Sequence, residues 1–267
     1  MPDALATTRK ARPILFSGPM VRAIYREIER PGTGKTQTRR TSGLDFVNDA
    51  PDRWEFRRFF TDAQGRYAAE FHGIGGKMVT IPCPYGGPGD LLWIKETWKP
   101  HFIYAHLRPR DVPASELFYR ADEAYAPSNT PWVPSIFMLR WMSRFTGISQ
   151  DIRAHRVQEI GDCDAIAEGL ITQEGDGLGP GPGFKWHGTG YHGGAVSKLW
   201  GRCYHTPHSD GRPGCSCNVA GPSPAQCAYR ELWDSINAKR GYGWDANPWA
   251  WAVTFRPILA NVDEVSS

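Results

Sequence analysis

The sequence predicts a mixed α+β fold, because it contains five to seven strand patterns and two or three helix patterns that do not alternate regularly. Regular alternation of strands and helices would instead indicate a doubly wound parallel sheet. A small barrel is the other architecture that this many short strands allow. The chain has 267 residues, enough for one elaborated domain or two small ones with a buried core.

The first elements are a short apolar strand at Ile14 to Phe16 and a helix at Pro19 to Glu29, whose apolar residues recur at helical spacing. A polar stretch rich in Asp and Arg follows, and it ends in a Pro/Gly-rich turn at Cys83 to Asp90. This turn leads into a strand at Leu91 to Trp98. Glu96 lies on the more apolar face of that strand, either in solvent at the strand end or in a pocket, where desolvation would raise its pKa.

The middle of the chain contains weaker patterns. A short strand is expected at Leu117 to Arg120, and an imperfectly alternating segment at Phe145 to Ile160 indicates one bent strand or two. Asp162 or Asp164 can then N-cap a short helix that stops at Gly169.

Glu168 occupies the last turn of that short helix, where the helix dipole disfavours a carboxylate. Its position indicates a functional task or a basic partner, and a surface glutamate without a role is the alternative. Regular structure returns with a helix at Pro224 to Ala238 and the clearest strand of the chain at Trp249 to Arg256.

These patterns divide the chain into a domain and an insertion. Residues 13–172 and 224–260 are expected to form one domain, interrupted by a Gly/Pro-rich, irregular insertion at 173–223. Residues 1–12 and 261–267 are expected to be flexible ends.

The insertion and the residues just after it hold a cluster of thiol and imidazole side chains. Zinc prefers these ligands, so the cluster predicts a structural zinc site, although its Cys-x-His and Cys-x-Cys spacings are not those of a standard finger. Thiols and solvent-facing histidines without metal are the alternative. No cofactor is expected to be required for catalysis, since nothing nearby resembles the general base of a catalytic zinc. The candidate ligands are Cys203, His205, His208, Cys215, Cys217 and Cys227.

Composition constrains partners and compartment. The net charge of +3 is too small to indicate nucleic-acid binding by itself, although basic residues cluster locally and eleven Trp are available to stack on bases or fill the core. No stretch approaches the roughly 20 apolar residues of a membrane span. Six Cys without an export signal favour a reducing compartment, so we expect a cytoplasmic protein without a membrane partner.

The run from Gly34 to Arg40 is the most informative part of the chain, because it gathers an amine, two hydroxyls and two guanidiniums within seven residues. It resembles the end of a phosphate-binding loop, but Glu29 stands where that loop needs its first glycine. The run also follows a helix, whereas a phosphate loop joins a strand to a following helix. A nucleoside-triphosphate site is therefore not expected.

The same run, Lys35-Thr36-Gln37-Thr38-Arg39-Arg40, resembles the signature of the ASCH-domain family, a branch of the PUA-like β-barrel fold. Thr33 stands where the family has a leading glycine, with Gly32 and Gly34 on either side. The whole chain, apart from the insertion, is similar to the longer ASCH-like proteins of phages and prophages. The further motifs that carry this resemblance are Pro13 to Ser17, Cys83 to Gly86, Gly89-Asp90, Trp93 to Trp98, Pro134-Ser135, Arg140-Trp141, Ser143-Arg144, Leu232 to Asn237 and Trp244 to Trp249.

The resemblance implies an α+β, PUA-like barrel with flanking helices, in the cytoplasm of a bacterium or a phage-infected host. Small bacterial ASCH-domain amidohydrolases remove the acetyl group from acetylcytidine with a Lys, a Thr three residues later and a Glu on a later short helix. Lys35 and Thr38 match the first two of these residues by their places in the run from Gly34 to Arg40, which we call the strip. Glu168 matches the third by its place before the final strand. Further substrate contacts are expected from Thr36, Arg39, Arg40, Trp93, Glu96 and Arg144.

Amide cleavage requires a nucleophile, a group that moves its proton and donors for the oxyanion. Thr38 can be the nucleophile if burial or Arg39 lowers the pKa of the Lys35 amine, and Glu168 can orient that amine or protonate the leaving amine. Lys35 and Thr38 lie on opposite faces of an ideal strand, so they meet only if the strip is bent or looped.

Two other functions remain open. The strip can bind phosphates while Trp residues stack on bases, which would make the protein an RNA- or DNA-binding module without catalysis. A nuclease is the weaker alternative, because the sequence shows no evident carboxylate cluster for magnesium.

Overall fold

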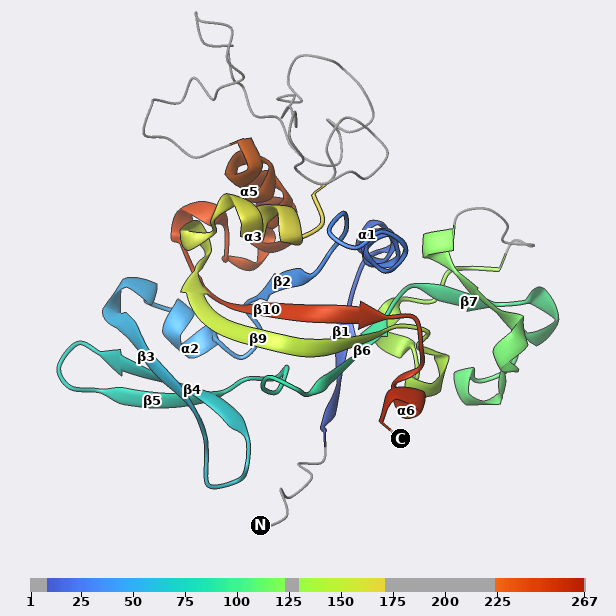
Figure 1. Ribbon diagram of the computed structural model, residues 1–267, viewed down its shortest axis with the longest axis horizontal. Coiled ribbons are helices and arrows are strands. Elements are labelled where there is room, and N and C mark those ends of the chain that lie inside the picture. The colour runs from blue at the N-terminus through green and yellow to red at the C-terminus, as the bar shows by residue number, and fades with distance from the viewer. Residues whose placement is uncertain (1–8, 123–129, 171–223, 267) are drawn as a thin grey trace, which may run out of the picture.

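The computed structural model describes residues 9–122, 130–170 and 224–266, and it shows a mixed α+β protein with several sheets and few helices (Figure 1). The predicted α+β class is therefore confirmed. Ten strands occur within the described ranges, more than the five to seven expected. They form a five-stranded sheet, a three-stranded sheet and a two-stranded pair.

The five-stranded sheet is the centre of the molecule and has the order β1-β6-β9-β10-β2. β1 and β6 are parallel, and the other neighbours are antiparallel. β1 and β2 are its two edge strands, although they come first and second in the chain. The strands span Ala11–Leu15 (β1), Gln37–Arg40 (β2), Leu91–Lys95 (β6), Thr146–Arg156 (β9) and Trp249–Ile258 (β10).

Three helices lie together on one side of this sheet (Figure 1). They are α1 at Gly18–Glu29, α3 at Asp162–Ala167 and α5 at Pro224–Asn237, close to the predicted positions. The N-cap of α3 is Gly161 rather than either aspartate, and Gly169 ends the helical segment at a φ of +92°. A positive φ is strained for any residue with a Cβ, which explains the glycine at that stop.

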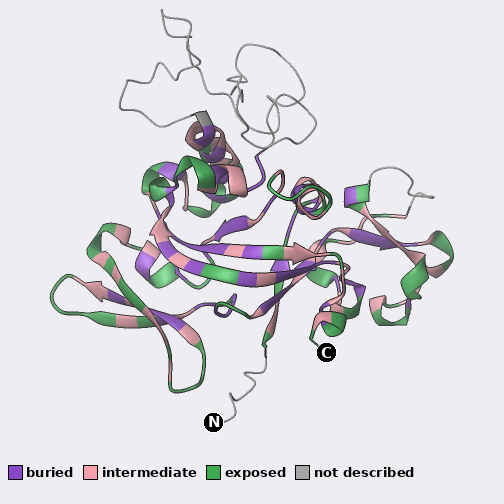
Figure 2. Cartoon of the chain, in the orientation of Figure 1, coloured by how far each residue is buried: buried purple, intermediate pink, exposed green. Residues whose placement is uncertain are grey.

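β10 is buried on both of its faces. Trp251 and Val253 are fully covered on one face and Ala252 on the other, because the strand lies between β9 and β2 and is packed from both sides. Burial is densest in this sheet and in the inner faces of its helices (purple in Figure 2). Five of the tryptophans in the described ranges, Trp98, Trp233, Trp244, Trp249 and Trp251, are core residues.

The polar stretch after the strip contains a three-stranded antiparallel sheet that the sequence patterns did not predict. It consists of β3 at Trp54–Thr61, β4 at Tyr67–Gly73 and β5 at Met78–Pro82. A bulge between Phe56 and Arg58 shifts the register of β3 by one residue. This shift breaks the period-two alternation by which a half-buried strand is recognised.

The predicted strand at Leu91 to Trp98 is interrupted at Glu96 and Thr97. β6 ends at Lys95, and the chain enters a second pair formed by β7 at Trp98–Pro100 and β8 at Leu117–Tyr119. The Thr97 carbonyl accepts a hydrogen bond from the Arg120 amide, which fixes this change of sheet. β8 confirms the short strand expected at this place.

Both ends of the fold extend further than expected. β1 begins at Ala11, and the Lys10 amide donates to Asp90 Oδ1. The C-terminal residues form a short helix, α6 at Val262–Val265, in which the Asn261 side chain caps the first turn and Val262 is fully buried. Part of the segment from residue 261, which the sequence assigns to a flexible end, thus forms a helical turn that packs its valine into the protein. A further short helix, α2, spans Asp45–Asn48.

None of the helices in the described ranges is both long enough and apolar enough to cross a bilayer.

Candidate functional site

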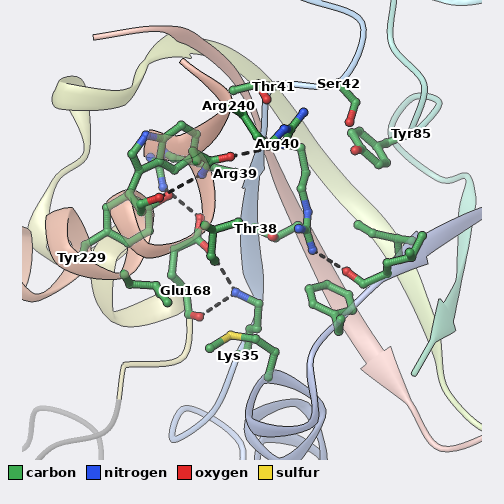
Figure 3. Close-up of a pocket in the computed structure, with 18 of the residues that line it drawn as sticks. Lys35, Thr38, Arg39, Arg40, Thr41, Ser42, Tyr85, Glu168, Tyr229 and Arg240 are labelled. Carbon is green, nitrogen blue, oxygen red and sulfur yellow. Dashed lines mark hydrogen bonds and ion pairs between the residues drawn. The ribbon is translucent and has the colours of Figure 1, made fainter. Parts of the chain in front are cut away.

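A cavity of about 260 Å³ lies between the two edge strands of the five-stranded sheet. Residues of β1 form one wall, the strip forms the other, and α5 with the following turn covers it (Figure 3). The Arg40 guanidinium bridges the two walls by donating to the Leu15 carbonyl at 2.6 Å. The polar side chains that line it include those of Lys35, Thr38, Arg39, Arg40, Thr41, Ser42, Glu168, Tyr229 and Arg240.

The strip reaches this cavity because its backbone is held on three sides. The Lys35 amide donates to the Ala23 carbonyl of α1, and the Thr36 amide donates to the Ala167 carbonyl of α3. The Thr36 carbonyl accepts from the Phe255 amide of β10. Gly34 makes this approach to α1 possible, since a Cβ at this position would lie 2.2 Å from the Ala23 carbonyl oxygen.

The glycine amides of the loop are already occupied. Gly32 and Gly34 donate to the Glu27 carboxylate at 2.9 and 2.8 Å. In a phosphate loop such amides hold the phosphates of a bound nucleotide. Here a carboxylate of α1 takes that place, which agrees with the exclusion of a nucleoside-triphosphate site.

Lys35 and Glu168 form a buried ion pair at the bottom of the cavity. Lys35 Nζ donates to the Glu168 carbonyl at 2.6 Å and to Glu168 Oε2 at 2.9 Å, and the two residues are 1% and 3% exposed. Burial lowers the pKa of Lys35, although the Glu168 carboxylate opposes this shift. Arg40 and Arg39 lower it further. Glu168 thus has the basic partner that its unfavourable place at the end of a helix indicated.

Arg39 secures the Glu168 carboxylate from the other side. Its Nη1 donates to Glu168 Oε1 at 3.4 Å and to Gln37 Oε1 at 2.7 Å, and its Nη2 donates to Asp164 Oδ2 at 2.7 Å. Burial would raise the pKa of Asp164, but hydrogen bonds from Arg153 and Arg39 outweigh it and lower that pKa. The Arg39 side chain is fully buried in these pairs and lines the cavity, and its guanidinium holds the Glu168 carboxylate.

Thr38 lines the same cavity as Lys35 and Glu168 (Figure 3). It lies in β2, where it pairs with Val253, and it is 3% exposed. Lys35 precedes β2, which begins at Gln37, so it does not follow the alternation of the strand. Both side chains line the cavity, although they would lie on opposite faces of an ideal strand.

One face of α5 covers the cavity. Tyr229, Leu232, Trp233 and Ile236 line it, together with Arg240 from the 3-10 turn Ala238–Arg240. Burial raises the pKa of Tyr229 well above its usual value, so the phenol stays neutral. Their helical spacing places them on one side of α5, and the packing of α5 in the fold turns that side toward the cavity.

Four predicted substrate contacts lie away from the cavity. Thr36 makes backbone hydrogen bonds to Ala167 and Phe255. Trp93 lies on β6, where Lys95 Nζ is 5.1 Å from the centroid of its ring. Glu96 and Arg144 pair with each other instead. Their positions along the chain did not reveal this, because they are 48 residues apart and belong to different segments.

The Glu96–Arg144 pair joins the end of β6 to the start of β9. Arg144 donates to both Glu96 oxygens at 2.8 and 3.1 Å and to both Asp122 oxygens, and its guanidinium lies 4.1 Å from the Tyr119 ring centroid. Glu96 is 1% exposed, so of the two positions that the sequence left open for it, the solvent position is wrong and the buried one is correct. Burial raises the pKa of Glu96, although Arg144 opposes this. The ion pair stabilises the segment at which the chain leaves the five-stranded sheet and enters the β7–β8 pair.

The predicted zinc ligands Cys203, His205, His208, Cys215 and Cys217 lie outside the described residues. Cys227 lies on α5 and is partly buried. Among the residues described, no three His, Cys, Asp or Glu side chains are grouped as a metal site would require.

Comparison with known proteins identifies no relative: no family model, no curated protein and no solved structure matches the chain.

Proposed function

We propose that the protein is an amidohydrolase that acts on a small modified nucleoside or nucleotide, such as an N(4)-acylated cytidine. One observation carries the proposal: a buried Lys35–Glu168 ion pair lies in the wall of a cavity that Thr38 also lines. The resemblance of the strip to the ASCH signature supports it, and we assign the domain to the PUA-like barrels on the same ground. The sheet, whose two edge strands face one cavity, is compatible with that assignment.

The proposed reaction begins at the Thr38 hydroxyl. Neutral Lys35 removes its proton while the oxygen attacks the acyl carbon of the substrate. The C–N bond then breaks, and the proton passes from Lys35 to the exocyclic amine, which leaves with the nucleoside. Water cleaves the resulting ester, which returns the hydroxyl to Thr38 and releases the acid. Glu168 holds the Lys35 amine in place throughout, and Arg39 holds Glu168.

The size of the cavity favours a small substrate. Its volume of about 260 Å³ is just below the roughly 300–1,000 Å³ of typical ligand pockets. One nucleoside is the appropriate scale for such a space, whereas an open groove would suit a polymer. The buried positions of five tryptophans also leave them unable to stack on bases.

A screen of acylated cytidines tests the proposal. The wild-type protein should release the acid, and Lys35→Ala, Thr38→Ala and Glu168→Ala should each lower kcat/KM by roughly 10²–10⁴-fold, because each removes part of the proton-transfer apparatus. Lys77→Ala and Thr80→Ala, at exposed positions far from the cavity, are the matched controls and should retain activity. Circular dichroism and thermal melts of every variant separate lost chemistry from lost folding.

Absence of turnover by the wild-type protein, together with salt-sensitive binding of RNA or DNA, would contradict the proposal. That result would instead favour a binding module in which the strip contacts phosphates.

A further inference from the structure

The cavity has two chemically different ends (Figure 3). Lys35 and Glu168 occupy one end. Thr41, Ser42 and Arg240 lie toward the other, with Ser42 beside Tyr85 (Figure 3). The Arg40 guanidinium lies between the two ends, because it and Lys35 Nζ both approach the Phe16 ring, at 5.1 and 5.7 Å from its centroid. The first end matches the acyl-transfer chemistry proposed above, and it leaves the second end without a task.

The charges at the first end are balanced within the protein. Lys35 and Arg39 supply two positive charges, and they pair with the two carboxylates of Glu168 and Asp164. Burying these four groups is tolerable because each charge has an opposite partner at hydrogen-bond distance.

The cations at the second end bind neutral oxygens rather than carboxylates. Arg40 donates to the Leu15 carbonyl at 2.6 Å, and Arg240 donates to the Asn237 side-chain oxygen at 3.5 Å. Both guanidiniums keep further N–H groups, since each carries five donors. Among the described residues no carboxylate pairs with either guanidinium, so both add positive charge next to the cavity.

Within the described residues, Arg40 Nε and the hydroxyl of Thr41, whose residue is 3% exposed, are buried and have no hydrogen-bond partner. Arg39 Nε, near the first end, is a third such atom. Buried donors are nearly always paired in folded proteins, because an unpaired one loses its interaction with water without replacement. Two unpaired donors beside an excess of positive charge are what an anionic ligand would satisfy.

We propose that the second end binds a phosphate group, so that the preferred substrate is a nucleoside monophosphate rather than a free nucleoside. The identity of the substrate as a modified nucleotide rests on the proposed function, whereas the anion site rests on Arg40, Thr41 and Arg240 alone. Guanidinium groups bind phosphate through paired, charge-assisted hydrogen bonds, and a hydroxyl adds a donor. The base would then lie toward Lys35 and Thr38, at the opposite end.

Isothermal titration calorimetry of the full chain tests the site without depending on turnover. The probes are cytidine, cytidine 5′-monophosphate and cytidine 3′-monophosphate. At least one monophosphate should bind roughly ten-fold more tightly than cytidine, and the difference should shrink as salt increases. In Arg240→Gln and Arg40→Gln that preference should fall by roughly ten-fold. Lys239→Gln, which removes the same charge from the neighbouring exposed residue outside the cavity, should keep it.

Equal affinities of wild-type protein for cytidine and both monophosphates would overturn the anion site. A preference for monophosphate that both arginine variants retain would also overturn it. Arg240 is exposed, so its variant should fold even if the change at Arg40 is disruptive. If no acylated cytidine is hydrolysed but the arginine-dependent preference is present, the proposed function fails and the anion site stands.

Discussion

Lys35 is the residue on which the chemistry of the cavity depends. An amine accepts a proton only in its neutral form, and burial moves its pKa down from the ordinary value of 10.5. The Glu168 carboxylate moves that pKa in the opposite direction, so Glu168 orients the amine at some cost to its basicity. Removal of Glu168 takes away the carboxylate that pairs with the buried Lys35 amine, whereas removal of Lys35 leaves Glu168 with Arg39 as its remaining cationic partner.

This balance predicts how activity depends on pH. The kcat/KM of the wild-type protein should rise with pH through the lowered pKa of Lys35 and level off at a pH below 10.5. In Glu168→Gln the rising limb should move to lower pH in whatever activity remains, because the carboxylate that raises the pKa of Lys35 is gone. A pH profile of an acylated cytidine's hydrolysis measures both.

The same pKa shift has a consequence for stability. The pKa of Lys35 is lower in the folded protein than in the unfolded chain, where it has the ordinary value of 10.5. Between these two pKa values the unfolded chain binds more protons than the folded protein, so the free energy of unfolding rises with pH in that window. Lys35→Met should remove this contribution. A pH profile of wild-type kcat/KM that does not rise with pH would contradict the assignment of Lys35 as the base.

At the scale of elements, the loop between α1 and β2 decides where the strip lies. Gly34 allows the backbone to approach α1, the Glu27 carboxylate binds the loop amides, and Gly169 lets the end of α3 come close to Lys35. A Cβ on Gly169 would lie 3.0 Å from the Lys35 Cβ. Two glycines distant in sequence thus permit the contact between the strip and α3.

Gly34→Ala should therefore destabilise the protein and reduce activity together. The added methyl group would meet the Ala23 carbonyl at 2.2 Å, and we expect a loss of roughly 1–3 kcal/mol in the free energy of unfolding. Gly18→Ala is the matched control, because its Cβ would have no neighbour closer than 3.9 Å. Urea denaturation measures both variants. Equal stability of Gly34→Ala and wild type would show that the loop is not held as described.

For the whole molecule, the arrangement of the five-stranded sheet creates the cavity. β1 and β2 are its edges, and the wall residues of both face one space that α5 covers from the C-terminal part of the chain. The candidate zinc ligands bear on the whole molecule, because five of them precede α5 in the chain and Cys227 lies on it.

We expect about one zinc per chain in the purified protein, since four thiolate or imidazole ligands complete a structural site. Cys215→Ser should lose this metal and lower the melting temperature. Cys163→Ser, which changes an exposed cysteine of α3, is the control and should keep it. Elemental analysis by mass spectrometry measures the content. Wild-type protein that is folded and free of metal would disprove the site.

Local patterns in the sequence were sufficient for α1, α5, β8, β10 and the Gly169 stop, because helical spacing, alternation and glycine act over a few residues. They were insufficient for the sheet β3-β4-β5, where the register shift between Phe56 and Arg58 hides the alternation. The expected substrate contacts Glu96 and Arg144 do not line the cavity, because they pair with each other.

The sequence by itself determined the composition of the strip, the mixed α+β class and the unusual place of Glu168 at a helix end. Only the tertiary structure decided which charges are buried and paired. Lys35 and Glu168 are 133 residues apart, and Arg39 and Asp164 are 125 apart. An ion pair and the pKa shift that accompanies it depend on the environment assembled around both groups, which no local pattern contains.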